Sequence, residues 1–439
     1  MESIEINGFL TIAHANFEIR KINILIGAQA QGKSVIAKLA YFFKNFFSDI
    51  FILSVEKFST KREIEKECLT QFEQIFPRYS WANQEFSIVY KYENYDVSII
   101  NAKAGNKFTL KFNFCRELTD LHKELKNRYK LALNNFDGRV EVESGKKTRR
   151  IINIFHEIVA EKINDSAFSK IFENPIFIPA SRSFFANLQK NIFSFLANDI
   201  DIDPFIKEFG FRYEKSKRLH QIGFQILKIR HPDKDNVDDD IQKKIDKLFR
   251  DIVSGEYEFS EEQDWIISKG RKTNLTNSSS GQQESLPMLL ILSIWPFIFA
   301  NNKRLDIYFI EEPEAHLFPT SQKQIISLIA TIYNAFGHSF FITTHSPYIL
   351  TAINNLVVGQ DAYDKANGDT EKLKRLEKVL PTDELIRLED VSAYTLNKGK
   401  LESIIDMENR LIGANLLDSV SDEFEAAFGV ATDILYGDD

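Results

Sequence analysis

A phosphate-binding loop is predicted close to the N-terminus, because residues 27–34 have the spacing G-x-x-x-x-G-K-S. Glycines let the backbone wrap around phosphates, and a helix that starts there presents free N–H groups to them. The apolar run Ile22–Ile26 precedes the pattern and the helix-like run Val35–Phe46 follows it, which argues against the alternative of a chance match. The candidate nucleotide-binding residues of this loop are Gly27, Ala28, Gln29, Ala30, Gln31, Gly32, Lys33 and Ser34.

Specific roles follow for the last two residues of the loop and for a pair of acids. Lys33 would reach the β- and γ-phosphates, and the Ser34 hydroxyl would bind Mg²⁺. The run Ile307–Ile310 ends in Glu311 and Glu312. We assign Glu311 to the metal, directly or through water, and Glu312 to the activation of an attacking water. The alternative is a solvated strand end, since acids often end strands.

Two more segments could contact phosphate. A Ser-Gly turn at a predicted helix start offers N–H groups and a hydroxyl to an anion, although a plain N-cap gives the same pattern. Its residues are Ser280, Gly281, Gln282 and Gln283. His345 follows the apolar run Phe340–Ile342 and could hydrogen-bond the γ-phosphate, whereas a lone histidine is more often structural.

Composition describes a globular protein without signs of a membrane or disulfide class. The 439 residues are 44% hydrophobic and 27% charged, with a net charge of −8, which argues against a generally basic nucleic-acid-coating protein. Cys68 and Cys115 show no metal-type spacing. We expect no signal stretch, no membrane span and a cytoplasmic location.

The coarse pattern of elements is that of an α/β protein. A helical stretch is expected over 35–75, a hairpin over 86–100, and alternating helices and strands from about 270 onward, and these imply a covered, mostly parallel sheet. The remaining expected strands are 3–12, 15–26 (with a break near His14), 108–114, 175–180, 256–259, 265–268, 306–310 and 339–343. The remaining expected helices are 116–135, 148–165, 184–198, most of 199–250, 284–300 and 320–336.

Together these motifs resemble the ATP-binding-cassette class of ATPases, in the SMC/RecF-like and OLD-like branch. The run Glu311–Pro319 is similar to that branch's EEPEAHLHP, and Thr343–Pro347 is similar to its TTHSP. Ile178–Ser183 resembles its IPAxRS, and Asn23 fits the residue that opens its phosphate-loop motif. The chain departs from the family pattern at two positions. Ala30 stands where the family often has glycine, and Gln282 replaces the second glycine of the family's Ser-Gly-Gly-Gln.

The resemblance implies an α/β ATPase head with a mostly parallel core sheet, N-terminal antiparallel strands and an inserted α+β and helical region. It divides the chain into an N-terminal part of the head (1–80), an insertion (81–260), a C-terminal part of the head (261–355) and a helical, acidic C-terminal region (356–439). It also implies ATP and Mg²⁺ as cofactors, and a homodimer or higher oligomer in which each ATP lies between one copy's phosphate loop and the other copy's Ser-Gly turn.

The biological role remains open among several readings. The chain resembles anti-phage defence ATPases such as AriA of PARIS and PtuA of Septu, which implies a sensor or scaffold for a separate effector protein. We expect the segment after His345 to be too short for the OLD-type nuclease domain, and the acids between Asp233 and Asp240 are interpreted as solvated. A RecF-like DNA-repair or chromosome ATPase, a transporter motor and a degenerate structural module are the rivals.

Charge patterning and one arginine leave further alternatives open. Residues 116–150 carry ten Lys/Arg and six acids, a net charge of +4, so nucleic acid is a possible partner. Residues 401–439 carry ten acids and one arginine, a net charge of −9, and could bind a protein partner. Both segments could equally be solvated surfaces. Arg182 could contact nucleotide or signal to the insertion, or be a solvated helix-start residue.

Overall fold

The computed structural model of the chain describes residues 1–105, 107–137, 154–155, 157–159, 161, 170–188, 202–222, 239–298, 305–413 and 425–430. Within these ranges the chain forms an 11-stranded sheet, a 3-stranded sheet and a 2-stranded sheet. The large sheet has the strand order β6-β5-β4-β1-β2-β14-β13-β3-β12-β11-β7.

Five neighbouring strands at one end of the large sheet are all parallel to one another. In spatial order they are β13 (Val391–Asn397), β3 (Ile22–Ile26), β12 (Ser339–Thr344), β11 (Asp306–Glu311) and β7 (Asn174–Ile178). β3, β11 and β12 are buried at every residue, as expected for parallel strands covered on both faces. The phosphate-binding loop and the acidic pair both follow strands of this group.

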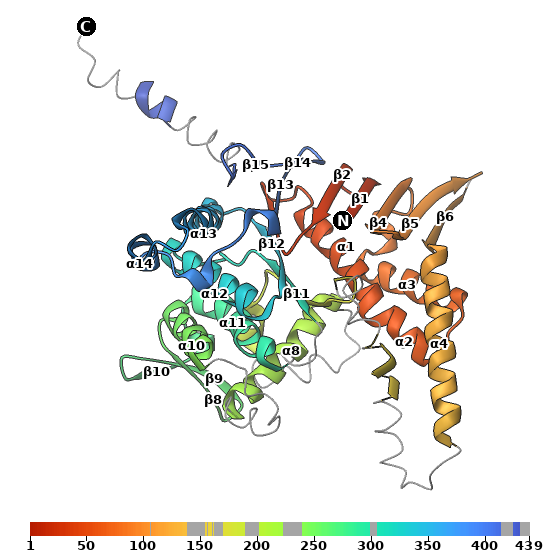
Figure 1. The fold of residues 1–439 in the computed structure, drawn as a ribbon, viewed down its shortest axis with the longest axis horizontal. Coiled ribbons are helices and arrows are strands. Elements are labelled where there is room, and N and C mark those ends of the chain that lie inside the picture. Colours follow the sequence, from red (N-terminus) through yellow and green to blue (C-terminus); the bar gives the residue numbers. More distant parts are fainter. Residues whose placement is uncertain are drawn as a thin grey trace.

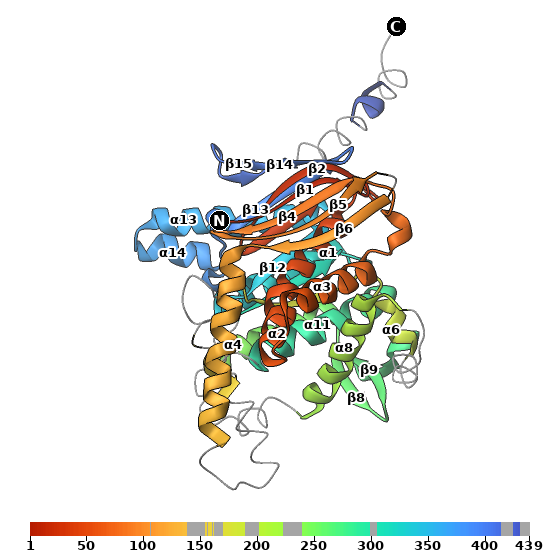
Figure 2. The ribbon, with the colours of Figure 1, turned by 90° about the vertical axis from the view of Figure 1, so that its right-hand side faces the viewer.

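The remainder of the sheet is largely antiparallel and comes mostly from the N-terminal quarter of the chain. Burial alternates along its first strand, so one face packs on the core and the other faces outward. In Figure 2 this part lies as a layer above α2 and α3. Its strands are β1 (Glu2–Phe9), β2 (Ile12–Ile19), β4 (Phe86–Tyr92), β5 (Tyr95–Ala104), β6 (Lys107–Phe114) and β14 (Lys400–Ser403).

Two apolar cores lie on opposite faces of the parallel strands. Alternate residues of one strand enter different cores: Tyr308 and Ile310 pack into one, whereas Ile307 and Phe309 pack into the other. Figure 1 shows the helices of the two cores on opposite sides of β11 and β12. One group is α1 (Lys33–Asn45), the π-helix Phe46–Phe51, α2 (Ile52–Glu56), α3 (Lys61–Ile75) and α4 (Arg116–Asp137), and the other includes α11 (Ser280–Ile298), α12 (Pro319–Phe336) and α13 (Pro347–Ala366).

A small three-stranded sheet packs beside α11 together with two further helices. Its buried polar centre is Asp264, whose carboxylate accepts hydrogen bonds from the hydroxyls of Tyr213 (2.9 Å) and Tyr257 (2.6 Å) and pairs with Lys217 (2.9 Å). This network ties the sheet to α8, which packs on α11. The elements are α8 (Pro204–Ile222), α10 (Asp239–Val253), β8 (Glu256–Ser260), β9 (Gln263–Ser268) and β10 (Arg271–Asn274).

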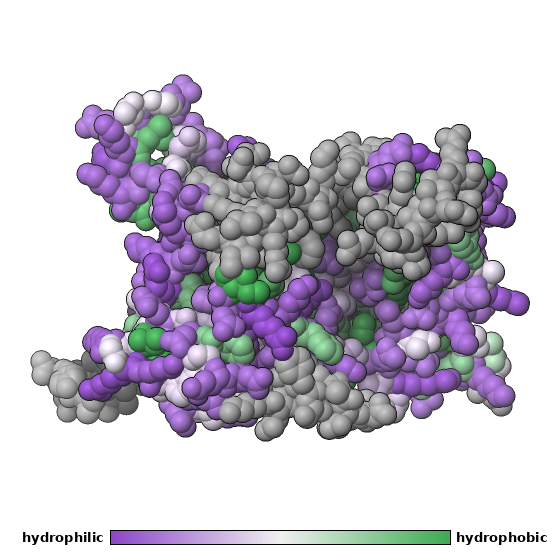
Figure 3. All heavy atoms as spheres, turned by 90° about the horizontal axis from the view of Figure 1, so that it is seen from below, coloured by the Kyte–Doolittle hydropathy of each residue, from purple (hydrophilic) through white to green (hydrophobic). Residues whose placement is uncertain are grey.

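One face of the molecule shows how the apolar side chains are distributed at the surface. Seen from below (Figure 3), the described surface is mainly hydrophilic, and its hydrophobic residues form small separate groups. Across the described part of the chain, no helix combines the length and the apolar character that crossing a membrane would require.

The predicted fold class is confirmed, and so are most predicted elements of the described residues. The hairpin β4–β5, the strands β6, β11 and β12, and the helix α12 lie where the sequence placed them. The expected helix 184–198 begins as α6 (Ser183–Leu188), and its continuation lies outside the described residues, as does most of 148–165.

Three expectations need correction. The N-terminal run has three strands rather than two. The Asn23 side chain accepts a hydrogen bond from the Arg20 N–H and donates one to the Arg20 carbonyl, which closes a turn that the alternation of apolar and polar residues does not reveal. Residues 356–439 are not simply helical, since β13 and β14 join the large sheet. The strands of 81–260 do not stand apart, since β4–β6 and β7 belong to that same sheet. Local patterning predicts a strand but not the sheet that it joins.

Candidate nucleotide site

The phosphate-binding loop (Gly27–Ser34) links β3 to α1 through a strained turn. Its backbone is left-handed at Ala30 (φ 60°) and Gly32 (φ 104°). A Cβ added at Gly32 would lie 2.8 Å from the Thr11 hydroxyl, so only glycine fits there without movement. No side chain caps the first turn of α1, and although the Val35 N–H donates to the Gly32 carbonyl (3.0 Å), the start of this helix still favours an anionic ligand. Ala30 adopts the turn although the family often has glycine there, at a cost of about 1 kcal/mol.

Lys33 lies inside this loop with its side chain largely buried. Its Nζ donates hydrogen bonds to the carbonyls of Gly27 (2.6 Å) and Ala28 (2.8 Å). Burial lowers the pKa of Lys33, while the nearby carboxylates of Glu312 and Glu314 act in the opposite direction. The loop lysine and the acids after β11 therefore influence each other electrostatically, and the role of Glu312 stays a prediction.

A buried amide supports the strand that leads into the loop. The Asn23 Nδ2 donates to the carbonyl of Phe340 on β12 (3.0 Å), and its Oδ1 accepts from the hydroxyl of Ser392 on β13 (2.8 Å). β13 also contributes the Leu396 carbonyl, which would lie 3.2 Å from a Cβ at Gly27. Sequence reasoning missed this C-terminal support, and Asn23 was the only signal for it.

The two acids occupy different environments at the end of β11. Glu311 pairs in register with Thr343 on β12, which pairs with Leu25 on β3, so the acid lies level with the end of the phosphate-loop strand. Glu311 is buried, and its Oε1 has no hydrogen-bond partner among the described residues. Glu312 is more exposed and has a left-handed backbone (φ 44°), with its N–H donating to the Thr343 carbonyl (2.9 Å). Such strain is common at functional positions.

His345 lies beside the carboxylates of Glu312 and Glu314, and these three residues together are called the acidic corner. Its Nδ1 lies 3.7 Å from Glu312 Oε1 and 3.5 Å from Glu314 Oε1, and 41% of its side chain is exposed. Glu314 fixes the histidine backbone, because its Oε1 accepts hydrogen bonds from the His345 N–H (2.9 Å) and the Thr344 hydroxyl (2.7 Å). Glu314 was not among the predicted site residues, although the run of three acids in Glu311–Glu314 was a signal for it.

The Ser-Gly turn, here called the signature turn (Ser280–Gln283), is built by its own hydrogen bonds. Gln282 and Ser279 form a capping box, in which Gln282 Oε1 accepts from the Ser279 N–H and hydroxyl (both 3.1 Å). The Gln283 amide donates to three loop carbonyls. Both glutamine side chains thus hold the turn, whereas Ser280 is exposed at its surface. A Cβ at Gly281 would lie 2.8 Å from the His316 carbonyl, so this position requires glycine.

The donor set fits a magnesium ion. Hard oxygen ligands suit Mg²⁺, which usually takes one or two protein oxygens and completes its shell with water and phosphate. The exposed Ser34 hydroxyl and the unpartnered buried Oε1 of Glu311 are the predicted protein donors. Among the described residues no group of three or more His, Cys, Asp and Glu side chains is placed to hold a metal by itself.

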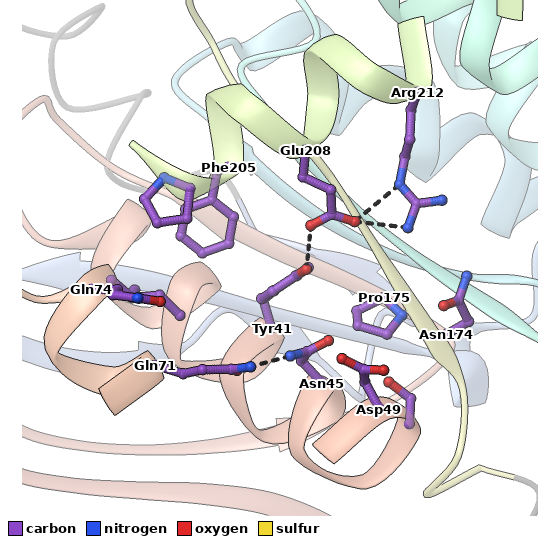
Figure 4. A pocket seen from close by; sticks show the side chains of 13 residues that line it. Tyr41, Asn45, Asp49, Gln71, Gln74, Asn174, Pro175, Phe205, Glu208 and Arg212 are labelled. Atoms are coloured by element: carbon purple, nitrogen blue, oxygen red, sulfur yellow. Dashed lines mark hydrogen bonds and ion pairs between the residues drawn. The ribbon is translucent and has the colours of Figure 1, made fainter. Parts of the chain in front are cut away.

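A separate cavity of about 420 Å³ lies away from these residues, between α1, α3, β7 and α8. In Figure 4 the Tyr41 hydroxyl points to Glu208, which also pairs with Arg212. None of the predicted nucleotide-site residues lines it. It is therefore not the site that the motifs predict, and its polar groups pair across the cavity.

The loop, the acids and the histidine all lie at the ends of neighbouring parallel strands of an α/β fold, and together they stay the predicted nucleotide site. A family model described as the AAA ATPase domain matches residues 1–350. The chain therefore belongs to the AAA ATPase domain family, and the prediction of an ATPase is confirmed at this level.

Solved structures similar to the chain include two SMC heads and a recombination mediator. An SMC head bound to the C-winged helix domain of ScpA has a TM-score of 0.39 at 11% identity, covering 93% of this chain and 98% of that chain. The SMC head domain from Thermotoga maritima has a TM-score of 0.33 at 11% identity, covering 92% and 97%. RecF with ATP has a TM-score of 0.32 at 12% identity, covering 91% and 98%. A comparison with curated protein sequences gave no match.

Proposed function

We propose that this protein is an SMC/RecF-like ABC-type ATPase that hydrolyses ATP with Mg²⁺ at the phosphate-binding loop. The observation that carries the proposal is the convergence of Lys33, Glu312 and His345. The strand that ends in Thr344 pairs in register with the strand that leads into the loop, and on its other side with the strand that ends in Glu311. The Nδ1 of His345 lies within 3.7 Å of the carboxylates of Glu312 and Glu314. A cation, a carboxylate base and a hydrogen-bonding ring at the end of a phosphate loop are the groups that phosphoryl transfer to water requires.

Each residue has a distinct role in this proposal. Lys33 exchanges its bonds to the Gly27 and Ala28 carbonyls for phosphate oxygens. Glu312 accepts a proton from the attacking water, and His345 hydrogen-bonds the γ-phosphate and keeps Glu312 in place. Ser34 and Glu311 would hold the Mg²⁺, which neutralises charge on the phosphates when bound.

The signature turn is proposed to contact the ATP that is bound to the phosphate loop of a second copy of the chain. Ser280 is exposed, and the side chains of Gln282 and Gln283 are used inside the turn, so the serine hydroxyl and the helix N-terminus are what the turn offers to a ligand. Phe318 is 74% exposed and follows His316, whose carbonyl packs on Gly281, and Tyr348 is 53% exposed near His345. Exposed aromatic residues beside a site favour burial against a partner. A homodimer would sandwich two ATP molecules.

For the biological role we propose a sensor or scaffold in a prokaryotic anti-phage system that controls a separate effector protein. The motif set Glu311–Pro319 and Thr343–Pro347 supports it through its resemblance to AriA and PtuA. Cells that carry the gene with its neighbours should survive phage challenge, and Lys33→Ala should abolish the protection. Unchanged survival with Lys33→Ala would contradict the role. Hydrolysis that rises strongly with DNA and falls steeply with salt would favour the RecF-like alternative.

The ATPase proposal is tested by phosphate release from the purified protein. We expect Mg²⁺-dependent turnover that Lys33→Ala abolishes through lost binding. Glu312→Gln should bind ATP as the parent does and hydrolyse it about 10²- to 10³-fold more slowly, the range for loss of a general base. Turnover of Glu312→Gln at the parental rate would contradict the assignment of the base.

A further inference from the structure

Arg182 is a fully buried cation that lies between the signature turn and Glu312, the proposed base. It follows β7, and its exposed fraction is 0%. Two of the three sequence-based interpretations of this residue do not fit its environment: it is not on a solvated face, and its side-chain donors bind protein carbonyls rather than facing a nucleotide. Burying a guanidinium is unfavourable unless its donors are satisfied, so its partners show what it holds in place.

The partners of Arg182 come from three separate segments of the chain. Nε donates to the Glu284 carbonyl (3.0 Å) in the first turns of α11. Nη1 donates to the carbonyls of Pro179 (3.0 Å) and Glu311 (2.7 Å), and Nη2 donates to the carbonyl of Glu312 (2.9 Å). The guanidinium group of Arg182 therefore joins the end of β7, the start of α11 and the end of β11.

The charge of Arg182 is balanced by the same helix. The Glu284 carboxylate, itself 4% exposed, lies 3.6 Å from Nε and accepts a hydrogen bond from the Arg182 N–H (3.1 Å). Burial lowers the pKa of Arg182, and Glu284 is the largest of the charges that oppose this effect. The link between Arg182 and α11 is thus both electrostatic and geometric.

The bonds to β11 act on a strained residue. Glu312 has a φ of 44°, and its backbone is held on one side by Thr343, which accepts from its N–H (2.9 Å), and on the other by Arg182, which donates to its carbonyl (2.9 Å). Without one of these bonds, Glu312 would relax toward an ordinary backbone conformation and its carboxylate would move.

We propose that Arg182 is a positioning residue that couples the signature turn to Glu312. Ser280 stands one helical turn before Glu284, so a shift of Ser280 on meeting a phosphate is transmitted through Arg182 to the Glu312 backbone. The inference rests on the proposed function and adds a regulatory consequence. A chain hydrolyses its own ATP efficiently only while its signature turn is engaged by the other copy's nucleotide.

The test compares two buried cations. Arg182→Lys keeps the charge but cannot span the three carbonyl groups of Glu284, Glu311 and Glu312. Lys44→Met is the control, since Lys44 is equally buried (0%) and pairs with Glu2 and Glu173 through contacts that include neither Arg182 nor the acidic corner. We expect kcat of Arg182→Lys to fall about 30-fold or more, because a shift of about 1 Å can lower a rate 10²-fold, with KM for ATP changed less than about threefold.

A second readout separates positioning from general loss of stability. Hydrogen exchange of the peptide 311–318 should be faster in Arg182→Lys than in the parent, and unchanged in Lys44→Met even though its Tm falls. If Arg182→Lys does not fold, Glu284→Gln should show the same selective fall in kcat, because it removes the one carboxylate that forms an ion pair with Arg182 within the described part of the chain.

Three results would overturn the inference. They are a kcat within threefold of the parent in Arg182→Lys or Glu284→Gln, an equal fall in kcat in Lys44→Met, or a proportional change of KM that indicates lost ATP binding. A parent protein that does not hydrolyse ATP would instead refute the proposed function, and the inference with it.

Discussion

Asn23→Leu should destabilise the protein more than any other single change of similar size near the phosphate-binding loop. The amide is fully buried and makes four hydrogen bonds, to the N–H and C=O of Arg20 (both 2.7 Å), the carbonyl of Phe340 (3.0 Å) and the hydroxyl of Ser392 (2.8 Å). Leucine fills a similar volume and leaves those four groups unpaired. At roughly 1 kcal/mol for each hydrogen bond lost, the expected loss is about 4 kcal/mol.

Ser392→Ala is the matched control for this prediction, because it removes one of the four bonds and leaves the amide in place. We expect it to cost about 1 kcal/mol. The free energies of unfolding are compared by urea denaturation followed through tryptophan fluorescence, with equal slopes required for the comparison. A fourfold difference supports the amide as the tie between β3, β12 and β13. Equal losses in the two variants would refute that reasoning.

Two further predictions concern the loop and the pH dependence. Gly32→Ala should weaken ATP binding at least about tenfold, because the added Cβ would lie 2.8 Å from the Thr11 hydroxyl and the backbone φ is 104°. Adding Thr11→Ala to the same chain should recover part of the lost affinity. Full affinity of Gly32→Ala in a fluorescent-nucleotide titration would contradict this prediction. Burial lowers the pKa of His338 to about 4, and its Nδ1 accepts from the Asp306 N–H. In the unfolded chain this histidine has a pKa of about 6.5 and binds the proton first, so the free energy of unfolding should fall as pH drops from about 6.5 toward 4. His338→Asn should show a flatter profile of Tm against pH, and an unchanged slope would contradict the assignment.

The sequence predicted the strands and helices around the proposed site better than the segments that support them. Lys33, Glu312 and His345 come together because each follows a strand of the same parallel group, and parallel strands end at one edge of a sheet. Spacing and flanking pattern are local properties, so these positions could be read from the chain.

The supporting residues could not be predicted in the same way. β13 meets β3 across more than 360 residues of sequence, as the bond between Asn23 and Ser392 shows (369 positions apart), and no local pattern specifies that pairing. From the sequence, one interpretation of Arg182 was a solvated helix-start residue. Its buried position could not be predicted, because its hydrogen-bond partners include carbonyls of segments 102 to 130 positions away. Non-local hydrogen bonds of this kind leave no periodic signal.

The central proposal is that each ATP is held by the phosphate loop of one copy and the signature turn of the other. Lys33→Ala removes one half of every site, and Ser280→Arg blocks the other half. Each variant alone should be inactive. Coexpressed in equal amounts, half of the dimers combine the two variants, and each such dimer has one intact site. The mixture should therefore regain hydrolysis that neither variant has alone, with about one quarter of the parental rate as the upper limit. The rate should fall below that limit because the chain with the intact loop carries Ser280→Arg, so its own signature turn is not engaged and its Arg182 coupling is lost. A mixture as inactive as the single variants, or full activity of Ser280→Arg alone, would contradict a shared site.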